Sequence, residues 1–209
     1  MKKAFFLFII TIFFGVSAKA QVKTSSTMVY NEFRPSIIQL TDGRILKQPL
    51  TNIFLKNSSL VYKRGQETME ARMENIKSVT FDDRQYIRID SVLAYCVDSV
   101  NNDVLYCATV IDFVAYKTQL ANNNQITSLS MNDLIGYTTI DLSNDEDYKF
   151  PLIDLFYFKY NDQIVRAHER SIGKLLSKEK RRILKTFVTM DDFSWTEPKS
   201  LLRLLKALQ

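Results

Sequence analysis

The sequence predicts an α+β protein that is mainly antiparallel β: a small barrel, a second hairpin-rich sheet and two short C-terminal helices. Five or six short alternating runs, with turns every eight to twelve residues, occur from about Pro35 to Asp90, a spacing typical of small barrels and sandwiches, and hairpin-rich strands continue to about His168. Turn-forming dipeptides separate these runs, and Asp42-Gly43 is the clearest of them. After Ser171 the apolar spacing becomes that of helices.

Residues 1–20 predict a secretory signal peptide. Lys2 and Lys3 precede a continuous apolar run at 4–14, and 18–20 (Ala-Lys-Ala) offers small residues to a signal peptidase. A membrane anchor is the alternative, but a spanning helix needs about twenty apolar residues. We therefore expect cleavage, no transmembrane segment afterwards, and export through the inner membrane. The expected location is periplasmic or secreted, including a place peripheral to the outer membrane.

Cleavage would change the charge of the chain. The full sequence has 28 Lys and Arg against 23 Asp and Glu, a net charge of +5. Loss of Lys2, Lys3 and Lys19 would leave 25 basic residues against 23 acidic ones. The excess that remains lies in 163–209, where eleven basic residues face five acidic ones. This asymmetry indicates either a surface for an anionic partner or the solvated face of basic helices.

The first part of the mature chain predicts a lead-in and a small β-barrel-like unit. Residues 21–34 are polar and predict a flexible lead-in, and 35–90 predicts the barrel-like unit. Its expected elements are strand 36–41, a type I′ turn at Asp42-Gly43, strand 44–47, the hairpin 52–56 with 60–64, the extended segment 67–72, a tight turn at 73–76, and strands 78–81 and 85–90.

This order of elements resembles the small SH3-like barrels found in many exported bacterial proteins of unknown function. The resemblance covers about 35–90, and the residues that carry it are Leu40, Asp42, Gly43, Ile76 and Val79. The family has no catalytic set that could be transferred to this chain.

Residues 91–209 predict a second antiparallel sheet with a C-terminal helical segment, either as a separate domain or continuous with 35–90. The expected elements are the hairpin 93–100 with 104–116, a loop at 121–125, strand 135–142, an acidic loop at 143–148, and the hairpin 155–160 with 163–168 across Asn161-Asp162. Helical spacing follows in 171–188, with Ser177 as a cap. A last helix has Thr196 as its expected N-cap and Pro198 in its first turn. The apolar stripe of that helix consists of Leu201, Leu202, Leu205 and Leu208.

Cys96 and Cys107 are the only cysteines and form a disulfide candidate. If the turn centres on Asn101-Asn102, opposed residues have numbers that sum to 203, which places the two cysteines opposite each other. The Cα atoms of directly opposed residues lie about 4.5–5.5 Å apart, within the range of disulfides. We therefore expect a cross-strand bridge in an oxidising compartment, with two reduced thiols as the alternative.

Four cations recur at helical spacing opposite an apolar stripe. These candidates for an anionic-partner surface are Lys178, Arg181, Arg182 and Lys185, and the stripe consists of Leu176, Ile183, Leu184 and Phe187. Such a helix either lies on an anionic membrane surface or docks its apolar stripe on the sheet and turns the basic face to solvent.

Motifs for catalysis are lacking in the sequence. His168 is the only histidine, and no nucleophile elbow or phosphate-binding glycine loop occurs. The paired acids Asp82-Asp83 and Asp191-Asp192 lie in turn-like sequence.

We expect a non-enzymatic binding or structural module of the bacterial cell envelope without a cofactor. Its expected partner is an envelope protein, a glycan or a membrane surface, and not a nucleic acid. A small outer-membrane β-barrel protein and a carboxylate-dependent hydrolase are the alternatives.

Overall fold

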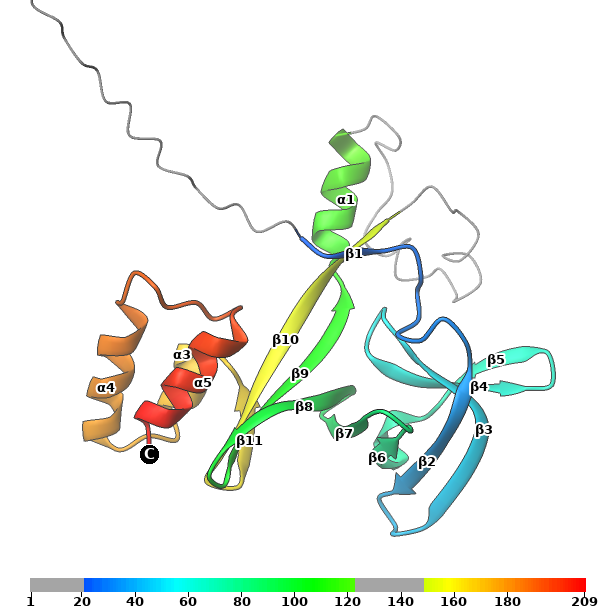
Figure 1. The fold of residues 1–209 in the computed structure, drawn as a ribbon, viewed down its shortest axis with the longest axis horizontal. Helices are drawn as coiled ribbons and strands as arrows, with labels where there is room; N and C mark the ends of the chain where they lie inside the picture. The colour runs from blue at the N-terminus through cyan, green and yellow to red at the C-terminus, as the bar shows by residue number, and fades with distance from the viewer. Residues whose placement is uncertain (1–20, 123–148) are drawn as a thin grey trace, which may run out of the picture.

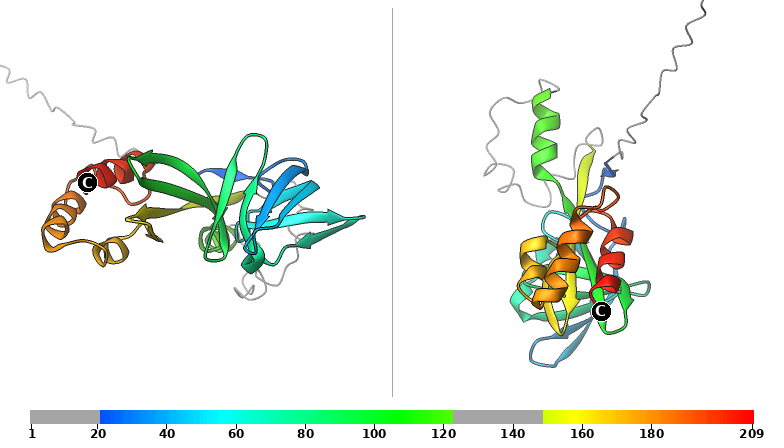
Figure 2. Two further views of the ribbon diagram at one scale, coloured as in Figure 1. Left: turned by 90° about the horizontal axis from the view of Figure 1, so that it is seen from below. Right: turned by 90° about the vertical axis from the view of Figure 1, so that its left-hand side faces the viewer.

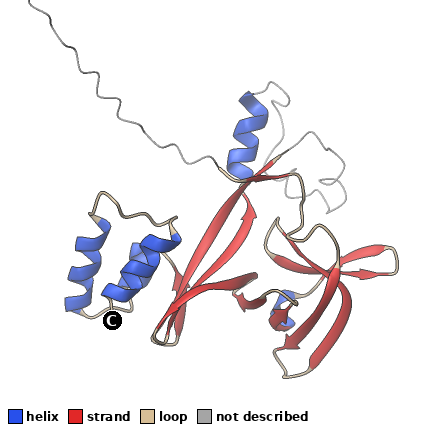
Figure 3. Cartoon of the chain, viewed as in Figure 1, coloured by secondary structure: helices blue, strands red, loops and turns tan. Residues whose placement is uncertain are grey.

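The computed structural model describes residues 21–122 and 149–209, and their strands form one curled antiparallel sheet. The strand order is β1-β10-β9-β8-β7-β6-β2-β3-β4-β5, and β11 pairs with β10 (Figure 1). Helices gather mainly at one end of the strands (Figure 3). The predicted fold class, α+β and mainly antiparallel β, is confirmed.

The elements occur in the following ranges. The strands are β1 (Lys23–Thr24), β2 (Arg34–Leu40), β3 (Ile45–Phe54), β4 (Ser59–Arg64), β5 (Glu67–Glu70), β6 (Ile76–Thr80), β7 (Gln85–Ile89), β8 (Val92–Val100), β9 (Asp103–Ile111), β10 (Phe150–Tyr160) and β11 (Gln163–Arg166). The helices are α1 (Phe113–Asn122), α3 (Glu169–Gly173), α4 (Lys178–Val188) and α5 (Pro198–Ala207), with a 3₁₀ helix at Met73–Asn75.

The segment 21–34 packs on the sheet, contrary to the expected flexible lead-in. Thr27 is buried, and its carbonyl accepts a hydrogen bond of 2.8 Å from the backbone N–H of Leu55. The buried Asn52 side chain accepts from the backbone N–H of Tyr30 and donates to the carbonyl of Tyr30 at 2.8 Å. Buried polar groups of the barrel therefore hold this segment in place.

The hairpin between β2 and β3 uses a different turn from the expected type I′. Only Gly43 has a positive φ, +89°, whereas a type I′ turn needs positive φ at both central residues. The carbonyl of Leu40 accepts from the N–H of Gly43 at 3.1 Å, and the Asp42 carboxylate accepts from the N–H of Arg44 at 3.0 Å. The side chain of Asp42 thus stabilises a longer turn in which glycine alone takes the left-handed conformation.

One long strand, β3, replaces the two strands expected at 44–47 and 52–56. Ser36 pairs with Gln48, but Arg34 pairs with Thr51, so β3 carries an extra residue around Pro49. Because a proline has no N–H to donate, a bulge is a position where a strand can accommodate it.

The hairpin of β8 and β9 shows that the register predicted for the cysteines is wrong. Near the turn the expected pairing holds, since Asp98 faces Leu105. A bulge between Cys96 and Asp98 then shifts the pairing by one residue, so Cys96 faces Tyr106 and Cys107 faces Tyr95. Successive residues point to opposite faces of a sheet. Cys96 is therefore exposed on one face, Cys107 is buried on the other, and both thiols are free.

The strand expected at 104–116 ends at Ile111, and helix α1 begins at Phe113. The Asp112 carboxylate accepts a 3.0 Å hydrogen bond from the backbone N–H of Ala115, which is the geometry of a helix N-cap. The expected loop at 121–125 therefore overlaps the end of this helix. The strand and acidic loop expected at 135–148 lie outside the described residues.

Two of the C-terminal predictions need correction. The helical segment expected at 171–188 is divided into α3 and α4, although Ser177 caps α4 as predicted. The N-cap of α5 is Glu197 and not Thr196, while Pro198 lies in the first turn as predicted. Four leucines of this end are fully buried, namely Leu201, Leu204, Leu205 and Leu208, whereas the expected Leu202 is only half-buried.

The sheet joins the two ends of the molecule without a linker. Strands β7 and β8 continue it from the barrel-like strands toward α3, α4 and α5, which lie at the opposite end of an elongated molecule (Figure 2). The Ser58 hydroxyl donates to the carbonyl of Leu93 at 2.6 Å, and the N–H of Leu93 donates back to the carbonyl of Ser58 at 2.8 Å. The turn before β4 is therefore fixed to the middle of the sheet.

Candidate functional site

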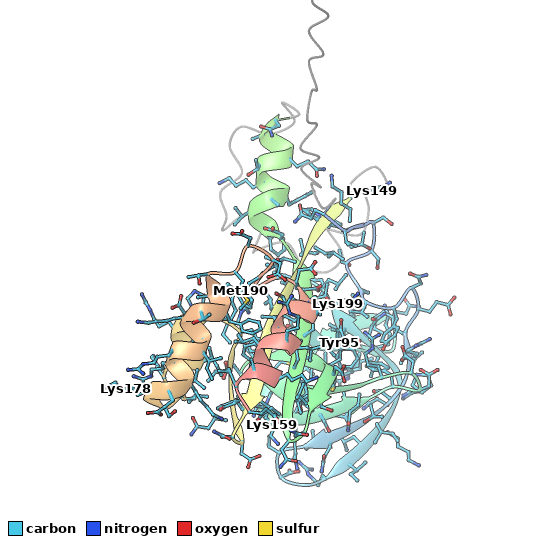
Figure 4. The ribbon with its side chains drawn as sticks, turned by 60° about the vertical axis from the view of Figure 1, so that its left-hand side comes forward. Tyr95, Lys149, Lys159, Lys178, Met190 and Lys199 are labelled. Atoms are coloured by element: carbon cyan, nitrogen blue, oxygen red, sulfur yellow. The ribbon has the colours of Figure 1, made fainter. Side chains whose placement is uncertain are left out.

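The four predicted cations lie on α4, the outermost helix of the C-terminal end. The Ser177 hydroxyl accepts from the N–H of Lys180 at 3.3 Å and so defines the first turn. Leu184 is the fully buried side chain of this helix, which sets its rotation. Lys178, Arg181, Arg182 and Lys185 are all exposed. Figure 4 labels Lys178, the first residue of α4, and Met190, two residues beyond its last residue Val188.

The apolar stripe opposite these cations is narrower than expected. Leu176 and Leu184 are buried and Phe187 is half-buried, but the side chain of Ile183 is 40% exposed. Met190, seven residues further on, is 39% exposed. Met190 follows the end of α4 at Val188, so the exposed apolar residue on the helix itself is Ile183, beside the cation Arg182.

A cleft of about 510 Å³ separates α3 from α4. Its lining consists of His168, Glu169, Arg170, Gly173, Lys174, Arg181, Leu184 and Lys185. The structure thus brings Arg181 and Lys185 together with two cations from α3 and its C-cap, while Lys178 and Arg182 do not line the cleft. Sequence reasoning missed Arg170 and Lys174, although their spacing of four residues repeats that of Arg181 and Lys185.

Local hydrogen bonds fix the position of this cleft. The Nε of Arg181 donates to the carbonyl of Gly173 at 2.8 Å and so connects α4 to the end of α3. His168 is the N-cap of α3, and its Nδ1 accepts from the N–H of Arg170 at 3.2 Å. An accepting Nδ1 leaves Nε2 as the protonated nitrogen of the neutral ring. The ring of His168 also stacks on Trp195, with centroids 6.0 Å apart.

Positive charge is concentrated around the two helices. Residues 163–190 contain eight Lys and Arg against two Glu. Among these cations, Lys180 points toward the protein core, since its ammonium donates to the Tyr160 hydroxyl at 2.9 Å. Glu179 interacts with the first turn of α4, where its own N–H and the Ser177 hydroxyl lower the pKa of its carboxyl. Among the described residues, no acid forms an ion pair with the cations that line the cleft.

A second cleft, of about 580 Å³, lies in the barrel-like strands. Its apolar wall includes the buried residues Ile38, Leu60 and Ile76. At its rim, the Arg44 guanidinium and the Asp42 carboxylate form an ion pair of 2.8 Å. The rim charges of this hairpin therefore already compensate each other.

Three of the four paired acids, namely Asp82, Asp83 and Asp192, form ion pairs with arginines. Arg34 contacts the carboxylates of Asp82 and Asp83 at 3.2 Å each, and the Tyr30 hydroxyl donates to Asp83 at 3.0 Å. Asp192 forms an ion pair of 2.7 Å with Arg203. The structure thus uses these carboxylates to join the lead-in and α5 to neighbouring loops.

The thiol of Cys107 is a poor nucleophile in this environment. Burial and, to a smaller extent, the nearby carboxylate of Asp154 raise the pKa of Cys107 to about 12. Burial also raises the pKa of the Cys96 thiol, with a smaller effect from Asp98. Since the thiolate is the reactive form, both cysteines are expected to be slow to react in the folded protein.

Within the part of the chain that the structure describes, His, Cys, Asp and Glu form no group of three or more that could bind a metal ion. No helix in those ranges is both long enough and apolar enough to span a membrane. Comparison with protein-family models, curated proteins and solved structures found no significant match to this chain. The fold and the site therefore define it as a β-rich α+β protein with a basic helical end.

Proposed function

We propose that this chain is an exported, non-enzymatic binding module of the bacterial cell envelope that attaches to an anionic membrane surface through its basic helical end. The attaching surface consists of the outer face of α4, with Lys178, Arg182 and Ile183, together with the cations of the cleft. The predicted signal peptide at 1–20 supports export.

The observation that carries this proposal is the excess of positive charge on and around α3 and α4. The excess of six positive charges in 163–209 arises entirely within 163–190. A basic residue near an anionic bilayer contributes about 1 kcal/mol of attraction, so several together can hold a protein at the surface. The exposed side chains of Ile183 on α4 and of Met190, in the segment that follows the helix, add apolar groups to this end of the molecule.

The barrel-like end would then be presented away from the membrane. The order β6-β2-β3-β4-β5, with a 3₁₀ helix between β5 and β6, supports the proposed likeness to SH3-like barrels. The strands that supply the lining of its cleft, β2 to β6, lie at the end of the molecule opposite α4 (Figure 2). An envelope protein or a glycan could meet this end while the helices remain on the lipid.

Vesicle sedimentation tests the attachment. The mature chain, from Gln21 onward, is expected to sediment with phosphatidylcholine vesicles that contain phosphatidylglycerol and not with vesicles of phosphatidylcholine alone. High salt should release it, because salt screens exposed charges. Absence of sedimentation with the anionic vesicles at low salt would overturn the proposal.

A matched pair of double variants identifies the surface. Lys178→Glu with Arg182→Glu reverses two charges on α4, and Lys47→Glu with Lys77→Glu reverses two exposed charges on the barrel-like strands. We expect the α4 variant to lose sedimentation and the barrel variant to retain most of it. Equal losses would indicate a response to net charge and would contradict the assignment to α4.

A further inference from the structure

The cleft between α3 and α4 collects like charges with which no acid of residues 21–122 or 149–209 forms an ion pair. Arg170 and Lys174 line one side, Arg181 and Lys185 line the other, and Glu169 is the only acidic side chain of the lining. Four cations around one opening repel each other, and an anion held between them would remove this repulsion.

The cations are attached to fixed elements. The hydrogen bond of 2.8 Å from Arg181 Nε to the Gly173 carbonyl occupies one of the five N–H groups of this guanidinium. Its terminal nitrogens remain as donors in a planar fork, an arrangement that suits oxygens of a phosphate. The Ser177 cap and the buried Leu184 fix the rotation of α4 on which Arg181 and Lys185 lie.

We propose that this cleft binds a phosphate group, and that in the cell the group belongs to the headgroup of an anionic lipid. This inference rests on the proposed attachment to an anionic membrane. A phosphate offers several strong acceptor oxygens to a set of guanidinium and ammonium groups, whereas a carboxylate offers only two oxygens and one charge. The cleft, of about 510 Å³, has room for such a group and for the donors around it.

Binding of inorganic phosphate to the mature chain, followed by calorimetry or amide chemical shifts, tests the cleft separately from the membrane. Lys174→Gln with Arg181→Gln removes one lysine and one arginine from the cleft. Lys178→Gln with Arg182→Gln removes the same two residue types from the part of α4 that does not line it. We expect the cleft variant to bind phosphate about tenfold more weakly or worse, and the outer variant to bind it like the wild type. The single variant Lys185→Gln, which breaks no hydrogen bond described above, should show a weaker loss if the double variant folds poorly.

The outcomes separate this inference from the proposed function. Equal losses of phosphate binding in the two double variants would contradict the cleft as a phosphate site. The same conclusion would follow if sodium chloride at the same ionic strength produced the heat or the chemical-shift changes seen with phosphate. Anionic vesicles that still bind the wild type would then leave the proposed attachment intact. Phosphate binding by the cleft without any vesicle binding would instead overturn the lipid headgroup as the source. Weakening of both phosphate and vesicle binding in the cleft variant supports the inference.

Discussion

Cys96 and Cys107 illustrate how one inserted residue decides the chemistry of a pair of side chains. The bulge before Asp98 places Cys96 on the exposed face and Cys107 among the side chains that α5 covers. A disulfide needs both Cβ atoms on the same side of the hairpin. The same two residues would be directly opposed if the pairing near the turn continued along the strands.

We expect the mature protein to keep both thiols free even after export. Mass spectrometry without reduction should find the chain with two thiols, and a small alkylating reagent should modify Cys96 first. Cys107 should react only on unfolding, because it is 1% exposed and its pKa is raised to about 12. Detection of a Cys96–Cys107 bridge in native material would contradict the register of β8 and β9.

A second prediction concerns Asn52, which is 1% exposed. Substitution Asn52→Ala would leave the part-buried N–H and carbonyl of Tyr30 without their partner, so we expect a loss of about 1–3 kcal/mol in the free energy of unfolding. Asn57 serves as the control, since its side chain bonds Glu70 at the surface and Asn57→Ala should cost about 0.5 kcal/mol or less. Urea denaturation measures both, and similar small losses would show that the lead-in is not held by Asn52.

At the scale of the elements, turns and helix caps were predictable, and the register of strands that are buried on both faces was not. The hairpin of β10 and β11 has the expected turn, with positive φ at Asn161 and Asp162, and α4 has its predicted cap. In β8 and β9, by contrast, Ala94 and Ala108 are buried on one face while Leu105 and Cys107 are buried on the other. Alternation cannot fix the register of such strands, because a shift by one residue still buries apolar groups.

The candidate site shows the same division between features set by local sequence and features set by packing. The α4 half of the cleft follows a helical period in one continuous segment, so the sequence predicts it. The α3 half does not, because Arg170 and Lys174 join the cluster only when the chain turns at Leu176 and α4 packs back on α3. Helix α1 was missed for a local reason, since its cap Asp112 follows directly on an apolar strand.

Helix α5 supplies the third prediction. Leu204 is 0% exposed in the core that α5 forms with β9 and β10, whereas Leu202 is half-buried beside that core. We expect Leu204→Ala to lower the free energy of unfolding by about 2–5 kcal/mol and Leu202→Ala to lower it by about 1 kcal/mol. Chemical denaturation distinguishes them, and a larger loss from Leu202→Ala would favour the stripe expected from the sequence over the observed packing.

At the scale of the whole molecule, the open question from the sequence was whether the two units are separate domains. Strands of both units belong to one sheet, and β7 and β8 pair directly at the junction. The two hydrogen bonds between Ser58 and Leu93 add a second connection. Domain boundaries normally fall in exposed linkers that few contacts cross. At this junction, by contrast, paired strands and hydrogen bonds connect the two units directly.

This continuity predicts that the described parts unfold together, and the single tryptophan can report it. Trp195 lies at the helical end, where its ring packs edge-on against Phe193 with centroids 5.0 Å apart. Val79 is 0% exposed in the core of the barrel-like strands, so Val79→Ala should destabilise that end by about 2 kcal/mol. If unfolding is cooperative, the urea midpoint of Trp195 fluorescence should fall together with that of far-UV circular dichroism, although the substitution is remote from the tryptophan.

Val114→Ala, at a residue that is 65% exposed, should move neither midpoint. A Trp195 transition that stays in place while the dichroism transition splits would instead show two domains that fold independently.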